Sequence, residues 1–190
     1  MRKWWRKGGP RPSEPSLAYV FISGPSENEA RLRGLAYFQR MLDAGQPVQI
    51  VRPDEGTTGF TINDGTVIYA NVPFTDMTEM AERVRTFSDG CPTNVTLLLD
   101  CHFPITDIPD IWVEGEDLQK YSVLFDSIPT ILANLRFADA VTVPHPQWAG
   151  DLLGVDPDLN VYILPDLVDD TQVDDFEVRF KSIVSDCRSR

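Results

Sequence analysis

The chain has 190 residues, of which 42% are hydrophobic and 24% charged, and these values predict one globular domain with an apolar core. No apolar run reaches the roughly 20 residues of a membrane-spanning helix, and no apolar segment of a secretory signal follows the basic N-terminus. The net charge of −12 combines five basic residues among the first eleven with 12 basic and 29 acidic residues in the remainder. This acidic body excludes broad binding to nucleic acids, since phosphates attract the opposite charge.

The cysteines indicate a reducing compartment. Cys91, Cys101 and Cys187 are odd in number and have no CxxC spacing, which argues against a structural zinc site. Reduced thiols are the simplest interpretation. The cysteines therefore predict a cytoplasmic protein without a metal site. A cofactor is not expected either.

Residues 1–16 have the composition of a flexible tail, because Pro, Gly and Ser dominate their second half. The tail combines two tryptophans with four cations, which are Trp4, Trp5, Arg2, Lys3, Arg6 and Lys7. Trp beside Lys and Arg is typical of segments that dock on a membrane surface or a protein partner. The alternative is a tail whose tryptophans fold back on the body.

Apolar and β-branched runs predict strands over residues 17–23, 46–52, 66–70, 95–101, 140–143 and 160–164. Helices are predicted over residues 26–44, 76–87, 118–137 (interrupted at Pro129) and 174–187, with an acidic loop over 103–116. Residues 17–166 form the predicted domain, and 167–190 contain a closing helix. The alternation of strands and helices predicts a single α/β, Rossmann-like, doubly wound and mostly parallel sheet with helices on both faces.

In such sheets, ligands bind beyond the carboxyl ends of the strands. The first predicted strand is followed by Gly24, Ser26 and Asn28, where backbone amides at a helix start could hold an anion. A plain turn with a capping serine is an equally good interpretation. After the strand over 140–143, His145 either caps a short helix or lines the same ligand cleft.

Asp100 and His102 lie at the carboxyl end of the most apolar strand and are the candidate catalytic residues. Side chains alternate along an extended strand, so both point to the same side. A carboxylate and an imidazole at such an end suit a general base or an acceptor-binding site. The alternative is a structural pair, with Asp100 capping the loop and His102 bonded to backbone.

The segment over residues 137–166 reads FADAVTVPHPQWAGDLLGVDPDLNVYILPD. It resembles the exit of the N-terminal, acceptor-side domain of GT-B glycosyltransferases, closest to those of tailed phages and related bacteria. The resemblance extends from Leu17 to Asp166 and includes LDAGQPVQIV at residues 42–51 and DCHFPITDIP at 100–109. Cys101 and His102 stand where the family has further acids, and Asp166 stands where it has Asn.

The resemblance implies a domain that binds the acceptor in a glycosyltransferase-related protein. In that family, the nucleotide sugar binds a second, donor domain, which this sequence is expected to lack. A protein partner or a homo-oligomer would then complete the site, in the host cytoplasm or a virion if a phage encodes the protein. The alternatives are a non-catalytic binding or structural module, such as a virion or assembly component, and a small nucleotide-binding enzyme. Catalytic activity is left open.

Overall fold

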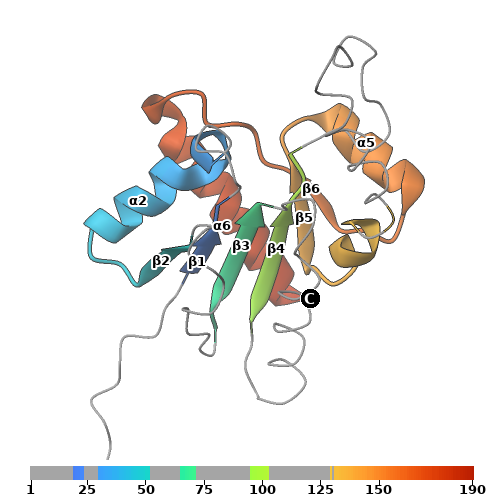
Figure 1. Cartoon of the computed structure of the whole chain (residues 1–190), viewed down its shortest axis with the longest axis horizontal. Helices are drawn as coiled ribbons and strands as arrows, with labels where there is room; N and C mark the ends of the chain where they lie inside the picture. The colour runs from blue at the N-terminus through green and yellow to red at the C-terminus, as the bar shows by residue number, and fades with distance from the viewer. Residues whose placement is uncertain (1–18, 24–29, 52–64, 72–94, 103–128, 130) are drawn as a thin grey trace, which may run out of the picture.

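The computed structural model describes residues 19–23, 30–51, 65–71, 95–102, 129 and 131–190. Their centre is a six-stranded sheet in which every pairing is parallel (Figure 1). The strands are β1 (Tyr19–Ile22), β2 (Val48–Val51), β3 (Val67–Asn71), β4 (Thr96–Asp100), β5 (Ala140–Val143) and β6 (Val161–Ile163). Each lies within the apolar run that predicted it, except that β3 extends one residue further, to Asn71.

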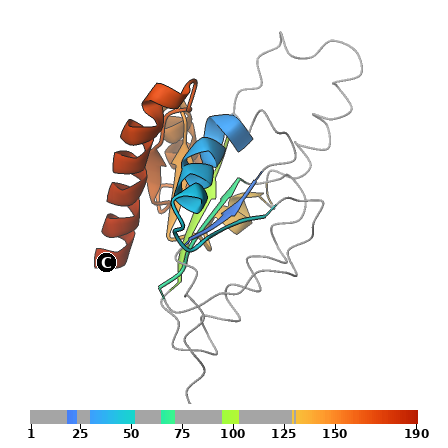
Figure 2. The same cartoon turned by 90° about the vertical axis from the view of Figure 1, so that its left-hand side faces the viewer.

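The strand order β2-β1-β3-β4-β5-β6 places the topological switch between β1 and β3. β3 and β4 are buried at every position, as strands covered on both faces should be. Helices lie on both faces, so the predicted α/β, Rossmann-like fold is confirmed (Figures 1 and 2). Here the sheet is parallel throughout.

Two apolar cores separate the layers. One contains Val20, Ala70 and Leu99 and is covered by residues 131–135 and by α5 (Pro146–Val155). The other contains Phe21, Tyr69 and Leu98 and is covered by α2 (Ala36–Asp43) and α6 (Val173–Ser189), which lie on the same side of the sheet (Figure 2). Aromatic rings fill this second core: Phe38 stacks on Phe21 at 4.7 Å between centroids and meets Phe180 edge-on at 5.4 Å.

The helix predicted over residues 26–44 is broken. A short irregular segment, η1 (Arg31–Leu35), precedes α2, and Gly34 inside it has φ of 114° and ψ of 2°. This left-handed conformation suits glycine, which has no Cβ. The break turns the chain tightly enough that a Cβ on Gly34 would lie 2.7 Å from the ring of Phe176 on α6.

After β6, the chain crosses the sheet through residues 164–168 and a single turn, η5 (Asp170–Gln172), before α6. α6 includes the predicted closing helix over 174–187 and buries Phe176, Phe180 and Ile183 in the second core. The predicted helix over 76–87, the loop over 103–116 and most of the helix over 118–137 lie outside the described residues. Among the helices described, none has the length and apolar character to cross a bilayer.

Candidate functional site at the carboxyl edge of the sheet

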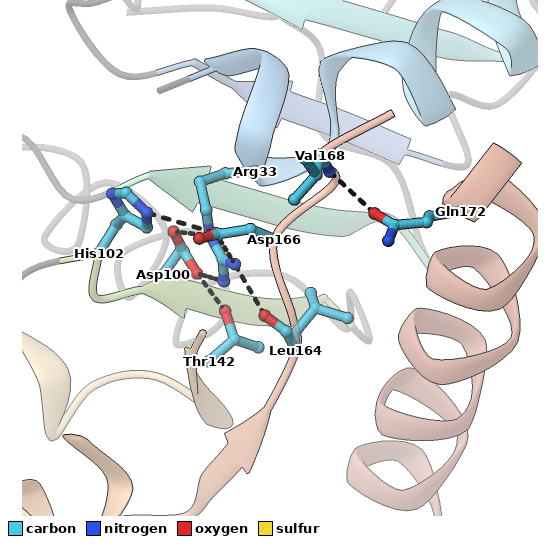
Figure 3. A network of polar contacts seen from close by, with 8 residues as sticks. All are labelled: Arg33, Asp100, His102, Thr142, Leu164, Asp166, Val168 and Gln172. Atoms are coloured by element: carbon cyan, nitrogen blue, oxygen red, sulfur yellow. Dashed lines mark hydrogen bonds and ion pairs between the residues drawn. The ribbon is translucent and has the colours of Figure 1, made fainter. Parts of the chain in front are cut away.

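A buried ion pair occupies the carboxyl edge. Arg33 of η1 and Asp100 at the end of β4 both have fully buried side chains. The Arg33 Nε donates to Asp100 Oδ2 at 2.9 Å, and Nη2 donates to Oδ1, so the contact is bidentate (Figure 3). A guanidinium and a carboxylate match in this geometry, which makes the pair directional as well as charged.

Asp100 accepts a further hydrogen bond, from the hydroxyl of Thr142 on β5 at 2.6 Å. Each of its oxygens therefore has a donor, which a buried carboxylate requires. The pKa of the neighbouring Tyr69 is raised, mainly by burial and then by the negative charge of Asp100. Tyr69 therefore stays neutral and adds no charge to the site. Asp100 is thus held in place by Thr142 and fixes the position of the Arg33 guanidinium.

Arg33 also holds the segment that leaves the sheet. Its Nη1 donates to the carbonyl oxygen of Leu164 at 2.7 Å and to Asp166 Oδ1 at 2.9 Å (Figure 3). One residue further on, the backbone N–H of Leu167 donates to the carbonyl of Leu32 at 2.8 Å. A single guanidinium therefore joins η1, the end of β4 and the exit from β6.

Asp166 has a second partner, His102, whose Nε2 lies 3.3 Å from Asp166 Oδ1 (Figure 3). Both side chains reach solvent, with exposed fractions of 24% for His102 and 32% for Asp166. The imidazole also meets the ring of Trp148 on α5 edge-on, at 6.1 Å between centroids. His102 and Asp166 are thus the accessible part of a network whose other members, Arg33 and Asp100, are buried.

Burial by itself would raise the pKa of Asp166. The hydrogen bond from His102 and the charge of Arg33 outweigh that effect, and the net pKa lies below the ordinary value of 3.8. Asp166 is therefore ionised at neutral pH. Counting Arg33, Asp100 and Asp166, the network has one positive and two negative charges when His102 is neutral.

The depressed pKa of Asp166 predicts a pH-dependent contribution to stability. That contribution is complete above pH 3.8 and is lost as the pH falls below it, because the proton must then displace the contacts of the ionised form. We expect Asp166→Asn to lower the free energy of unfolding at pH 7. The difference from wild type should shrink as the pH falls below 3.8.

Urea titrations at a series of pH values measure this difference. Asp151→Asn is the matched control, since Asp151 takes part in none of the ion pairs found among the described residues. A difference for Asp166→Asn that stays constant with pH would contradict the assignment.

The structure brings together two of the residues predicted as a site, Asp100 and His102, and adds a second carboxylate between His102 and Arg33. The other accessible candidate, His145, caps α5: its Nδ1 accepts from the backbone N–H of Gln147 at 3.2 Å. Gly24, Ser26 and Asn28 lie outside the described residues, and so does the tail that contains Trp4 and Trp5.

Sequence reasoning did not select Arg33, Thr142 or Asp166 as site residues. Arg33 lies within the helix predicted over residues 26–44, and only the adjacent Gly34 marks the turn that sends it inward. In the sequence, Asp166 belongs to the exit motif of residues 137–166. Within the described residues, no group of three or more His, Cys, Asp or Glu side chains is arranged to hold a metal ion.

Comparison with known proteins adds no relative: no protein-family description matches the sequence, and no curated protein is significantly similar to it.

Proposed function

We propose that this domain is the acceptor-side part of a glycosyltransferase-related protein, which binds an acceptor hydroxyl at His102 and needs a donor-binding domain or chain to transfer sugar. The observation that supports this proposal best is the pair of His102 and Asp166, at the carboxyl edge of a doubly wound sheet. Ligands of such sheets bind at this edge. The likeness of residues 137–166 to the exit of that domain in GT-B enzymes supports the same assignment.

The chemistry follows from the orientation of the imidazole. A neutral His102 that donates from Nε2 to Asp166 keeps Nδ1 as a proton acceptor. Asp166 fixes this tautomer, as an orienting carboxylate does beside a general base. In a transferring complex, Nδ1 would take the acceptor's hydroxyl proton. The hydroxyl oxygen would then bond to the anomeric carbon of the nucleotide sugar, and the nucleoside diphosphate would leave with the bonding electron pair.

Asp100, the other candidate catalytic residue, fits a supporting role better. Its carboxylate is fully buried and accepts from Arg33 and Thr142. A general base must reach the substrate proton, directly or through one water. We assign Asp100 to anchoring Arg33, which in turn positions Asp166.

A glycan array tests the proposal. We expect the wild-type protein to bind at least one mono- to tetrasaccharide on an array of bacterial and plant glycans, and His102→Ala to reduce that signal at least tenfold. Loss of one hydrogen bond to a charged or ionisable group accounts for such a change. UDP-glucose and GDP-mannose should be neither hydrolysed nor used for transfer by this chain alone.

The chain supplies its own control, since it has two histidines. His145→Asn preserves a side chain that can cap α5 and should leave the array signal unchanged. Equal losses in the two variants would place the effect outside the site. An array without any signal would contradict the acceptor-binding proposal.

A non-catalytic binding or structural module is the second candidate. The observation that favours it is the number of contacts by which Arg33 fixes the exit segment, through Leu164 and Asp166. Such a network stabilises a fold whether or not a ligand binds. An array without signal, together with correct folding of His102→Ala, would favour this candidate.

A further inference from the structure

Asn71 is a buried polar residue that the network described above does not use. It ends β3 and pairs in register with Asp100 of β4, while Ala70 pairs with Ile22 at the end of β1. Asn71 therefore lies at the switch point of the sheet, between the carboxyl ends of β1 and β4. Its exposed fraction is 5%.

The side chain shares a face of the sheet with Asp100. Tyr69 and Leu98 belong to the core under α2 and α6, whereas Ala70 and Leu99 belong to the opposite core. Because side chains alternate along a strand, Asn71 and Asp100 both point to the side of Tyr69. This is the side from which Arg33 approaches.

The side-chain amide of Asn71 is buried. Neither Oδ1 nor Nδ2 has a hydrogen-bond partner among the residues that the structure describes, and both atoms are shielded from solvent. Buried amides in native proteins are nearly always bonded, so each exception needs an explanation. A ligand at this edge would pair with the amide, because doubly wound sheets bind their ligands beyond the carboxyl ends of the strands.

We propose that Asn71 is a specificity-determining residue that binds two neighbouring hydroxyls of an uncharged sugar, on the same edge as His102. Oδ1 would accept from one hydroxyl and Nδ2 would donate to the next, which a vicinal diol satisfies. The excess of negative charge from Asp100 and Asp166 disfavours phosphates and other anions. This inference rests on the proposed function, since it specifies the ligand of the same site.

The first test measures the ligand-free protein and needs no sugar. Asn71→Leu keeps the size of the side chain and removes both unpaired polar atoms, so we expect Tm to rise by about 2–4 °C. Thr142→Val is the matched control, because it removes a buried hydroxyl that does have a partner, Asp100, and should lower Tm. A lower Tm for Asn71→Leu would show that the amide is already bonded within the protein and would overturn the inference.

The second test measures binding on the same glycan array. Asn71→Leu should reduce the array signal at least tenfold while remaining folded. If His102→Ala loses the signal and Asn71→Leu retains it, this inference fails and the proposed function stands. An array silent for wild type contradicts both. Calorimetric titration with the free base uracil, which has no vicinal diol, completes the test. Binding of uracil that Asn71→Leu abolishes would assign a nucleobase and overturn the sugar.

Discussion

Replacing Arg33 by methionine is expected to destabilise the domain by about 3–5 kcal/mol, because Asp100 then remains buried without its cation. Methionine fills most of the volume of the arginine stem, so the loss reports the charge and its hydrogen bonds more than a cavity. Small domains have free energies of unfolding of about 5–15 kcal/mol. The substitution should therefore remove a large share of the stability, measured by urea denaturation at pH 7.

Arg40→Met is the matched control. Arg40 also contacts two acids, Asp174 and Glu177, but its side chain is 45% exposed. Ion pairs at the surface contribute about 1 kcal/mol or less. Equal effects of the two substitutions would contradict the anchoring role of Arg33.

The double substitution Arg33→Met with Asp100→Leu separates the charge from the packing. Removing both partners leaves no unpaired charge at β4, and apolar replacements of buried ion pairs are often tolerated. We expect the double variant to be more stable than Arg33→Met alone. A double variant that is less stable would indicate that Asp100 contributes through Thr142 independently of Arg33.

The substitution Gly34→Ala is expected to destabilise the domain by about 2–5 kcal/mol. The φ of 114° is unfavourable for any residue with a Cβ, which costs about 1–2 kcal/mol. The new methyl group would also lie 2.7 Å from the ring of Phe176, and overpacking of this kind costs about 1–3 kcal/mol. Phe176 cannot move freely, since it packs against Tyr37 at 5.6 Å and Phe180 at 6.1 Å between centroids.

Gly45→Ala controls for the backbone conformation alone. Gly45 has φ of 72°, and no atom lies within 4 Å of the position that a Cβ would take. We expect only the conformational cost of about 1–2 kcal/mol there. Similar losses of stability at Gly34 and Gly45, in thermal or urea unfolding, would show that the ring of Phe176 moves to accommodate the new methyl group. The contact between η1 and α6 would then not be tightly packed.

The sheet was predictable because each central strand is a short, nearly continuous apolar run. Two strands, Val67–Asn71 and Thr96–Asp100, are buried on both faces. Burial on both faces requires apolar residues at successive positions, and such a run is visible in the sequence. The closing helix was predictable from the spacing of Phe176, Phe180 and Ile183. These are local patterns, set by the period of each element.

The site was predictable only in part, because its contacts join residues far apart in the chain. Arg33 and Asp166 are separated by 133 positions, and no local pattern indicates that they meet. Arginine on a helix usually lies in solvent, and the break at Gly34 turns this one inward. Asp100 and His102 were found because they end the most apolar strand, yet the partner of His102 comes from the exit segment.

In the proposed function, His102 presents a proton-accepting nitrogen, Nδ1, to a sugar hydroxyl. Long-range nitrogen–proton spectra test it directly, because the protein has two imidazoles. On titration with the glycan that binds best on the array, Nδ1 of His102 should shift as it accepts a hydrogen bond, while the nitrogens of His145 stay in place. A shift at His145, or no shift at His102 under saturating glycan, would contradict the binding role of His102.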